Sequence, residues 1–562
     1  MTINGLATEP VTAGRRRTGG RRTHAVRWAV LAVPLAFIGV FFLYPVGALL
    51  YRALHPGSHW DLSALVRVAD SPAMRQVVAF TLWQAVLSTA LVIAVGLPSA
   101  WVVSRYSFPG RGLVETLATV AFIMPTVVVA TAVSAALSPG GLFGWAVPDG
   151  WDRGLPAILI AHVYFNYAVV LRMVGSYWRQ LDRAPELAAA ALGASPWRVF
   201  ATVTWPRLKP AVWAAAGIVF LFTVTSFGVV LLLGLPGQAT IEVEIQRQVL
   251  FLFNLPLGAA LSLIQILIVI AMLVVQSLLS RNLASGVEVL DPTGADRPAR
   301  SGRDRLAVLV FLVVSLLLLV GPIAAVFQRA MATGGGYGFD NFQALGSSRA
   351  GSILFVPPTT AIANSLLFAT TATVIAMVVG SLAAFALASG SARVLSGALL
   401  LPLGVSAVTL GFGALIAFDS APLNLRGSPW LVPIVQSLVA IPFVVRAMVP
   451  VLRAIRVSLR EAAAVLGASP WQVVRTIDVP LVARSAVVAA GFAFAISLGE
   501  FGATVFVARG DHPTVPIAIY RFLGSPGASN QGQAMAMAAI LVVLTATVVL
   551  ITDRFRVPEV SS

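Results

Sequence analysis

Long apolar segments separated by short polar ones recur along the whole chain, from Val26 to Ile551. A helix of about twenty apolar residues spans the hydrocarbon core of a bilayer. Windows of that length predict a first set of spans near 28–50, 78–103, 113–136, 156–178, 211–234 and 257–279, and a second set near 305–328, 363–389, 395–417, 430–452, 485–507 and 532–552. The pattern therefore predicts an all-α integral membrane protein with twelve transmembrane helices in two sets of six.

The second set of spans repeats the first in sequence. A shift of 274 positions without a gap aligns the string LGASPW at residues 192–197 with the same string at 466–471. The register continues in the pairs Arg172 and Arg446, Pro206 and Pro480, Phe227 and Phe501, Thr240 and Thr514, and Arg247 and Arg521. Because each half has an even number of spans, the halves share one orientation and we expect a pseudo-two-fold axis along the membrane normal, with the pathway between them.

Composition and repeat together predict six consecutive segments. The stretch between the two sets of spans is rich in Gly, Pro and Arg, which is typical of a flexible linker. The segments are an N-terminal tail with the first span and its outer loop at 1–73, a first transmembrane domain at 74–280, the linker at 281–304, the seventh span and its outer loop at 305–360, a second transmembrane domain at 361–552, and a C-terminal tail at 553–562.

The net charge of +16 is explained best by membrane orientation. The basic residues are scattered between apolar segments and form no continuous patch with interleaved aromatic residues, which argues against a nucleic-acid partner. If both termini are cytoplasmic, the loops and tails on that side hold 26 Lys and Arg residues and the outer loops hold 10. The positive-inside rule therefore predicts a multi-pass protein of the cell inner (plasma) membrane, surrounded by lipid bilayer, with both termini in the cytoplasm.

Several catalytic chemistries are excluded by residue type. The chain has no cysteine, and Lys209 is its only lysine, with no phosphate-binding G-x-x-x-x-G-K-[ST] string around it. The chain therefore cannot hydrolyse ATP by that route. We find no His/Asp/Glu spacing for a metal, no Ser-His-Asp set and no G-x-S-x-G turn, so we predict no catalytic site, no metal and no cofactor. The Arg-rich N-terminus precedes a run too long for a signal peptide, which predicts an uncleaved first span.

The strongest motif is a loop that occurs once in each half, at 186–207 and 461–481. Each copy has an Ala-rich helix, a Gly for a sharp turn, a Ser-Pro pair suited to a helix start, and a short amphipathic helix that ends before a Pro. A compact connection between spans is the simpler alternative. Two closely similar copies at equivalent positions favour a shared docking role.

These two loops resemble the EAA loop of binding-protein-dependent ABC importer permeases. The residues that carry the resemblance are Glu186, Ala188, Ala189, Gly193, Ser195, Pro196, Trp197 and Pro206 in the first copy, and Glu461, Ala462, Ala463, Gly467, Ser469, Pro470, Trp471 and Pro480 in the second. The first copy departs from the pattern, because Glu186 is one position early and Leu187 occupies the usual acidic place.

The resemblance implies a fold and partners. The fold would be two ABC type-1 permease halves, and residues 196–202 and 470–476 would be coupling helices that enter grooves on two copies of a cytoplasmic ABC ATPase subunit. An extracytoplasmic solute-binding protein would deliver the solute, and ATP-driven closure of the ATPases would alternate access to the pathway.

Within this family the fused two-half layout resembles thiamine and ferric-iron importer permeases. The segments 161–174 and 226–245 are closer to the thiamine type, so thiamine is the expected solute and ferric iron the alternative. A secondary transporter with two six-helix halves is the alternative from another class. It would not need paired LGASPW loops, and it would carry more ionisable residues within its spans.

Polar residues within predicted spans are candidates for the translocation pathway. His162 and Asn166 are four positions apart and share a helix face. Glu500 lies in a span, and its partner in the repeat is Ser226, so any charge in the pathway is asymmetric. A satisfied interhelical hydrogen bond is the alternative for His162, and a structural or gating role is the preferred one for Glu500.

Two further carboxylates, Glu242 and Glu244, fall in the predicted outer loop between the fifth and sixth spans. We expect them to be solvated loop charges. Contact with a partner protein or with an entering cation is the alternative.

Overall fold

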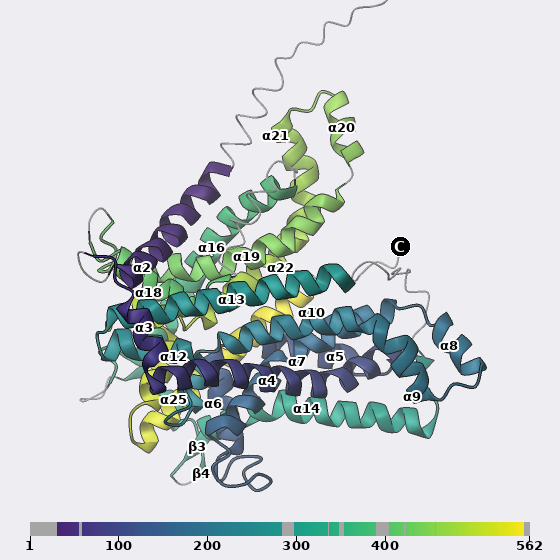
Figure 1. Cartoon of the computed structure of the whole chain (residues 1–562), viewed down its shortest axis with the longest axis horizontal. Coiled ribbons are helices and arrows are strands. Elements are labelled where there is room, and N and C mark those ends of the chain that lie inside the picture. Colours follow the sequence, from purple (N-terminus) through teal and green to yellow (C-terminus); the bar gives the residue numbers. More distant parts are fainter. Residues whose placement is uncertain are drawn as a thin grey trace, which may run out of the picture.

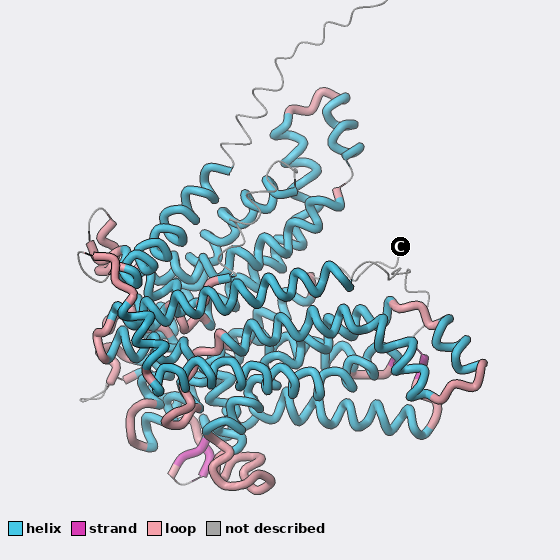
Figure 2. Tube along the Cα trace, in the orientation of Figure 1, coloured by secondary structure: helices cyan, strands magenta, loops and turns pink. Residues whose placement is uncertain are grey.

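The computed structural model describes residues 31–55, 59–283, 297–334, 336–347, 353–388, 404–420, 423–455 and 457–555. Most of these residues are helical, and most helices run side by side along the molecule (Figures 1 and 2). The predicted N-terminal tail, most of the predicted linker and the end of the predicted C-terminal tail lie outside the described ranges.

The first half runs from Leu31 to Leu283. Its elements are η1 (Gly39–Leu43), α2 (Tyr44–Leu54), α3 (Ser63–Asp70), α4 (Pro72–Arg105), α5 (Arg111–Ile123), α6 (Thr126–Leu137), α7 (Gly154–Gln180), α8 (Ala184–Ala191), α9 (Pro196–Val199), η2 (Phe200–Thr204), α10 (Trp205–Val224), α11 (Gly228–Leu233), α12 (Ile241–Gln246), η3 (Arg247–Phe251) and α13 (Leu255–Leu283).

The second half repeats this order. Its elements are α14 (Gly302–Met331), α15 (Asp340–Gln343), η4 (Ala344–Gly346), α16 (Pro358–Ala388), α18 (Ala407–Ala417), α19 (Leu431–Ala454), α20 (Val457–Val465), α21 (Pro470–Val473), η6 (Val474–Asp478), α22 (Val479–Gly499), α23 (Thr504–Val507), α24 (Val515–Leu523) and α25 (Ala528–Asp553). Two short strand pairs complete the described residues: parallel β1 (Tyr106–Ser107) with β2 (Arg297–Pro298), and antiparallel β3 (Ala332–Thr333) with β4 (Gly336–Tyr337).

Ten helices in the described residues are long and apolar enough to cross a membrane. The predicted span 113–136 consists of two helices, α5 and α6, with a bend of 111° between them. Pro125 has no backbone N–H and disfavours helical backbone at Met124, so the helix breaks there. The predicted span 395–417 lies partly outside the described residues, which include its last part as α18.

Two other predicted spans end early. The predictions 211–234 and 485–507 each cover a long helix and a separate short one, because α10 ends at Val224 and α22 ends at Gly499. The short helices α11 and α23 follow after breaks of a few residues. At the second break Glu500 has extended backbone, and its carboxylate accepts hydrogen bonds from the backbone amides of Ala503 and Thr504. A side chain that binds nearby backbone in this way competes with continuation of the helix.

The first span of each half packs against the other half. Helix α14 contacts α4, α5 and α6 of the first half, and the hydroxyl of Ser315 on α14 lies 2.8 Å from the hydroxyl of Tyr167 on α7. Helix α2 contacts α18 of the second half as well as α13, and the Tyr44 hydroxyl donates to the carbonyl of Ala417. This exchange of first spans ties the two halves together.

The apolar core is continuous between the halves in one region and divided in another. One buried cluster contains residues of both halves, including Phe227 and Phe501. Two further clusters are separate: one lies in α4, α7 and α10, and the other in α16, α19 and α22 with two residues of the first span. The molecule is therefore two separately packed arms on a shared base.

The two Ala-rich loops lie at the ends of these arms. Figure 1 shows α20 and α21 at the top of the view and α8 with α9 at its right edge, well apart, whereas α2, α12 and α18 lie together at the left, where the long helix α13 begins before it crosses the middle of the view. We call the end with α8, α9, α20 and α21 the paired-loop end, and the other the opposite end. The halves are joined at the opposite end and separated at the paired-loop end.

Candidate functional site

The turns in the two Ala-rich loops have the same backbone geometry. Gly193 has φ +84° and Gly467 has φ +86°, a conformation that favours glycine. The amide of Ala194 donates to the carbonyl of Ala189 at 3.1 Å, and the equivalent bond from Ala468 measures 3.0 Å. Both bonds belong to the glycine-terminated helix ending known as the Schellman motif.

The short helix after each turn begins with a side-chain cap. The Ser195 hydroxyl accepts from the amide of Arg198 at 3.4 Å, and the Ser469 hydroxyl accepts from the amide of Gln472 at 3.3 Å. In the second loop the Gln472 side chain also accepts from the Ser469 amide at 2.7 Å, which completes a capping box. Pro196 is the first helical residue, as expected for proline. The predicted helices 196–202 and 470–476 continue as one π-helical turn each, η2 and η6.

Large apolar side chains at both loop tips are exposed. Leu192 and Trp197 are 89% and 74% exposed, and their repeat partners Leu466 and Trp471 are 87% and 71% exposed. Exposed clusters of large apolar residues mark interaction sites. The two tips therefore present matching exposed apolar surfaces.

The base of each loop is anchored at aligned positions by different chemistry. Glu186 accepts from Arg105 at 2.7 Å and from the Thr204 hydroxyl at 2.6 Å. At the aligned positions of the second loop, Arg460 donates to Asp478 at 2.8 Å. The remaining predicted loop residues lie as follows: Ala188, Ala189, Ala462 and Ala463 in the Ala-rich helices, Glu461 exposed on α20, Pro470 at the start of α21, and Pro206 and Pro480 in the first turns of α10 and α22.

A cavity of about 310 Å³ lies between the halves, midway along α7. It brings together all four residues predicted for the pathway: His162, Asn166, Ser226 and Glu500. Its walls are mostly apolar, are rich in phenylalanine and come from both halves. The phenylalanines that line it are Phe122, Phe165, Phe222, Phe227, Phe443, Phe492 and Phe501. The structure thus places the predicted residues at one site, and their role in transport stays a prediction.

His162 links two neighbouring helices. Its Nδ1 lies 2.8 Å from the hydroxyl of Ser88 on α4, and its Nε2 lies 2.9 Å from the hydroxyl of Ser226. Asn166 donates to the backbone carbonyl of His162 at 3.0 Å. Both ring nitrogens are therefore occupied within the first half.

Glu500 holds the broken helix of the second half. Its Oε1 accepts from the amide of Ala503 at 2.7 Å, and its Oε2 accepts from both the amide and the hydroxyl of Thr504. These groups lie at the start of α23, where the helix dipole favours a negative charge. The structure thus gives both oxygens of Glu500 partners within its own half.

The prediction that Glu242 and Glu244 are solvated is wrong. Their exposed fractions are 0% and 1%. Helix α12 is held against α4 by the amide of Ile241, which donates to the hydroxyl of Thr81 at 2.9 Å. In the second half α24 is held in the same way, since Val515 donates to Ser365 on α16 at 2.8 Å. The repeat of Thr240 and Thr514 was the sequence signal for this shared packing.

Side chains at aligned positions meet each other where the two halves join. The rings of Phe227 and Phe501 stack with centroids 5.2 Å apart, and Gln246 donates to the Tyr520 hydroxyl at 3.5 Å. Positions related by the repeat can touch only near the pseudo-two-fold axis, so the axis passes here. Phe501 lines the central cavity and also contacts Tyr520, which lines a hollow of about 870 Å³ at the opposite end. This aromatic layer therefore separates the cavity from the opposite end.

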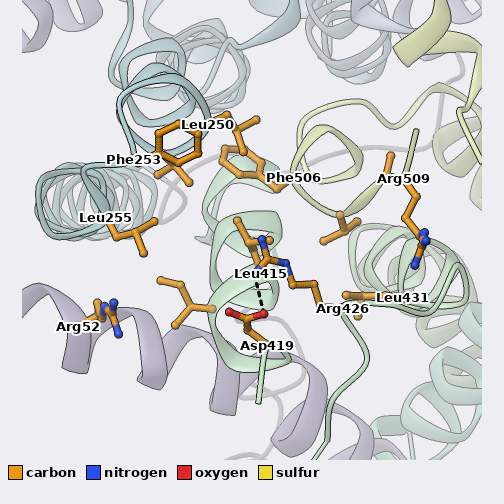
Figure 3. A pocket seen from close by; sticks show the side chains of 14 residues that line it. Arg52, Leu250, Phe253, Leu255, Leu415, Asp419, Arg426, Leu431, Phe506 and Arg509 are labelled. Carbon is orange, nitrogen blue, oxygen red and sulfur yellow. Dashed lines mark hydrogen bonds and ion pairs between the residues drawn. The ribbon is translucent and has the colours of Figure 1, made fainter. Parts of the chain in front are cut away.

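A second hollow of about 410 Å³ also lies at the opposite end, in an equivalent place in the repeat (Figure 3). Arg52, Arg426 and Arg509 lie around its apolar floor, and Asp419 accepts from Arg426 at 2.6 Å. The larger hollow has Asp152 at the position aligned with Arg426. The two hollows are therefore lined by equivalent segments of the two halves and differ in the charges of their lining residues.

No group of three or more potential metal ligands occurs in the part of the chain that the structure describes.

Comparisons with known proteins point in one direction. The family model described as "Binding-protein-dependent transport system inner membrane component" matches residues 92–287 and 376–560. The thiamine transport system permease protein of Salmonella typhimurium is 27% identical over 489 residues, covering 84% of this chain and 87% of the relative. That of Brucella abortus is 28% identical over 526 residues, covering 90% and 92%. A solved bacterial ABC transporter involved in import of the acidic polysaccharide alginate is 18% identical, with a TM-score of 0.39, covering 47% of this chain and 98% of that chain.

Proposed function

Because the chain belongs to the family of binding-protein-dependent transport system inner membrane components, we propose that it forms the complete pore of an ATP-driven thiamine importer. The family match falls once in each half, which agrees with one chain supplying both halves of a pore. Membership in this family removes the secondary transporter as an explanation.

The paired loops carry the assignment to ATP-driven transport. Two exposed apolar tips of the same geometry occur at positions related by the pseudo-two-fold axis, and each sits at the end of a separately packed arm. Such an arrangement fits two copies of one partner. With no phosphate-binding lysine loop in the sequence, ATP hydrolysis belongs to those partners, a pair of ABC ATPase subunits.

The arrangement of the arms supports alternating access. The paired loops lie apart and the aromatic layer of Phe227 and Phe501 is closed, so the described state opens toward the paired-loop end. With the paired loops in the cytoplasm, as the positive-inside rule favours, this is the inward-facing state. Closure of the ATPases would bring the loops together and separate the halves at the aromatic layer.

The opposite end then faces outward and receives the solute-binding protein. Its two hollows lie on either side of the pseudo-two-fold axis and differ in charge, one being ringed by Arg52, Arg426 and Arg509. A two-lobed binding protein has no such symmetry. The charge difference would let it dock in a single orientation.

Thiamine is supported by the relatives and by the chemistry of the cavity. Two relatives that match along most of the chain carry thiamine in their names. The cavity between the halves is lined with aromatic rings and contains two carboxylates, Glu242 and Glu500. Aromatic faces attract cations, and thiamine is an aromatic cation.

Reconstitution tests this function directly. The permease is placed in proteoliposomes with its ATPase and binding protein, and ATP-dependent uptake of radiolabelled thiamine is measured beside uptake of ferric iron. We expect saturable thiamine uptake that requires ATP and the binding protein. ATP-dependent uptake of iron with none of thiamine would assign the other solute, and uptake driven by an ion gradient without the ATPase would overturn the importer.

A further inference from the structure

We propose that Glu242 provides the anionic contact for the solute's positive charge inside the central cavity. This proposal rests on the function proposed above and names the residue that recognises the cation. It gives a role to a side chain that the sequence pattern placed in a solvated loop.

Glu242 is buried and incompletely bonded. Its exposed fraction is 0%, and it lines the cavity from α12. Its Oε2 accepts from the hydroxyl of Ser406 at 3.1 Å, across the boundary between the halves. Its Oε1 has no hydrogen-bond partner among the described residues. A buried carboxylate oxygen without a partner is costly, so a cation that reached it would gain a strong contact.

The neighbouring carboxylates have no such oxygen. Glu500 has both oxygens occupied by groups at the start of α23. Glu244 accepts from Gln248 at 2.6 Å through Oε1 and from Arg247 at 3.4 Å through Oε2. Of these three buried carboxylates, Glu242 alone has an oxygen with no hydrogen-bond partner among the described residues.

The rest of the cavity suits a flat organic cation. Its described lining includes no Arg or Lys, so no basic side chain of the lining competes with a solute for Glu242. Aromatic rings surround the space, and three of them, Phe122, Phe165 and Phe222, pack against one another with centroids 5.3 to 6.2 Å apart. A cationic ring is stabilised by a carboxylate at its charge and by aromatic faces around it.

Uptake kinetics of charge variants test the proposal. In the reconstituted transporter, Glu242→Gln removes the charge and keeps the shape, Glu242→Ala is a second neutral variant, and Glu242→Asp keeps the charge. Glu244→Gln is the matched control, because it removes the neighbouring buried charge. We expect the KM for thiamine to rise roughly tenfold or more in both neutral variants and by much less in Glu242→Asp, with Glu244→Gln close to wild type.

A neutral competitor separates charge recognition from a structural role. In 3-deazathiamine a carbon replaces the charged thiazolium nitrogen and the shape is kept. The wild type should prefer thiamine to this analogue, and in Glu242→Gln that preference should shrink about tenfold, a change that general loss of folding would not produce. Unchanged KM and unchanged preference in the neutral variants would overturn the role of Glu242. A wild type that transports no thiamine would overturn the proposed function and this inference with it.

Discussion

The two halves agree at the paired loops and differ at the central cavity. At the loops, Gly193 and Gly467 have φ values within 2° of each other, and the exposed tips carry the same residues. At the cavity, the aligned positions hold Ser226 and Glu500, and Glu242 is aligned with Pro516. On the proposed function, the repeat is retained where two identical ATPase subunits would dock and is lost where a single asymmetric solute would pass. The difference between the two regions would then distinguish the surface that couples to ATP hydrolysis from the surface that recognises the solute.

The largest expected effect comes from changing the left-handed turn that the two paired loops share. Gly467→Val puts a β-branched residue at a left-handed backbone position, where it costs about 1–3 kcal/mol and should shift the expected coupling helix α21. We expect transport to fall at least tenfold while the ATPase still hydrolyses ATP. Uptake and ATP hydrolysis are measured on the same proteoliposomes.

The control for this variant is Gly112→Val. Gly112 lies in α5 with ordinary helical backbone, and an added side chain there meets nothing within 4 Å. Normal coupled transport by Gly467→Val would show that the geometry of this turn does not determine the position of α21.

The next effect comes from the aromatic layer on the pseudo-two-fold axis. Phe501→Ala removes the stack with Phe227, a pair that contributes about 0.5–1.5 kcal/mol beyond its buried area. We expect passive, ATP-independent leak of thiamine from loaded proteoliposomes. Phe355→Ala is the control, because that ring is 83% exposed. A Phe501→Ala variant that shows no passive leak of thiamine and normal uptake would indicate that other residues form the barrier to thiamine.

A smaller effect is expected at Glu500, which holds the helix break of the second half and is aligned with Ser226 in the first half. Glu500→Gln keeps an oxygen that can accept from the backbone of α23, whereas Glu500→Ala leaves buried amides without a partner at a cost of about 1–3 kcal/mol. The Gln variant should transport normally, and the Ala variant should unfold at lower temperature in a fluorescence melt. Equal loss of uptake with unchanged melting in both variants would indicate that Glu500 recognises charge.

The sequence predicted the features that depend on local chemistry. Gly193 and Gly467 occupy left-handed turns, and Ser195 and Ser469 cap helices, because backbone geometry there is set by adjacent residues. The break between α5 and α6 was missed because hydropathy averages over Pro125. The burial of Glu242 was missed because it depends on α12 packing against α4 through Thr81, a contact between residues 160 positions apart.

The smallest effect tests one exposed position at which the Ala-rich helices of the paired loops differ in charge. Glu461 is exposed on α20, and its aligned residue in the first loop is Leu187, which is 57% exposed. An exposed charge pair contributes about 0–1 kcal/mol, so Glu461→Leu should weaken ATPase binding by about fivefold or less, and Leu187→Glu should strengthen it by a similar factor. Titrating the ATPase onto nanodisc-embedded permease measures both. Salt screens exposed charges, so the effect of Glu461→Leu should fade at high ionic strength. An effect that persists in high salt would mean that Leu187 and Glu461 contact the ATPase through apolar surface, and that the two loops are more alike than their charges suggest.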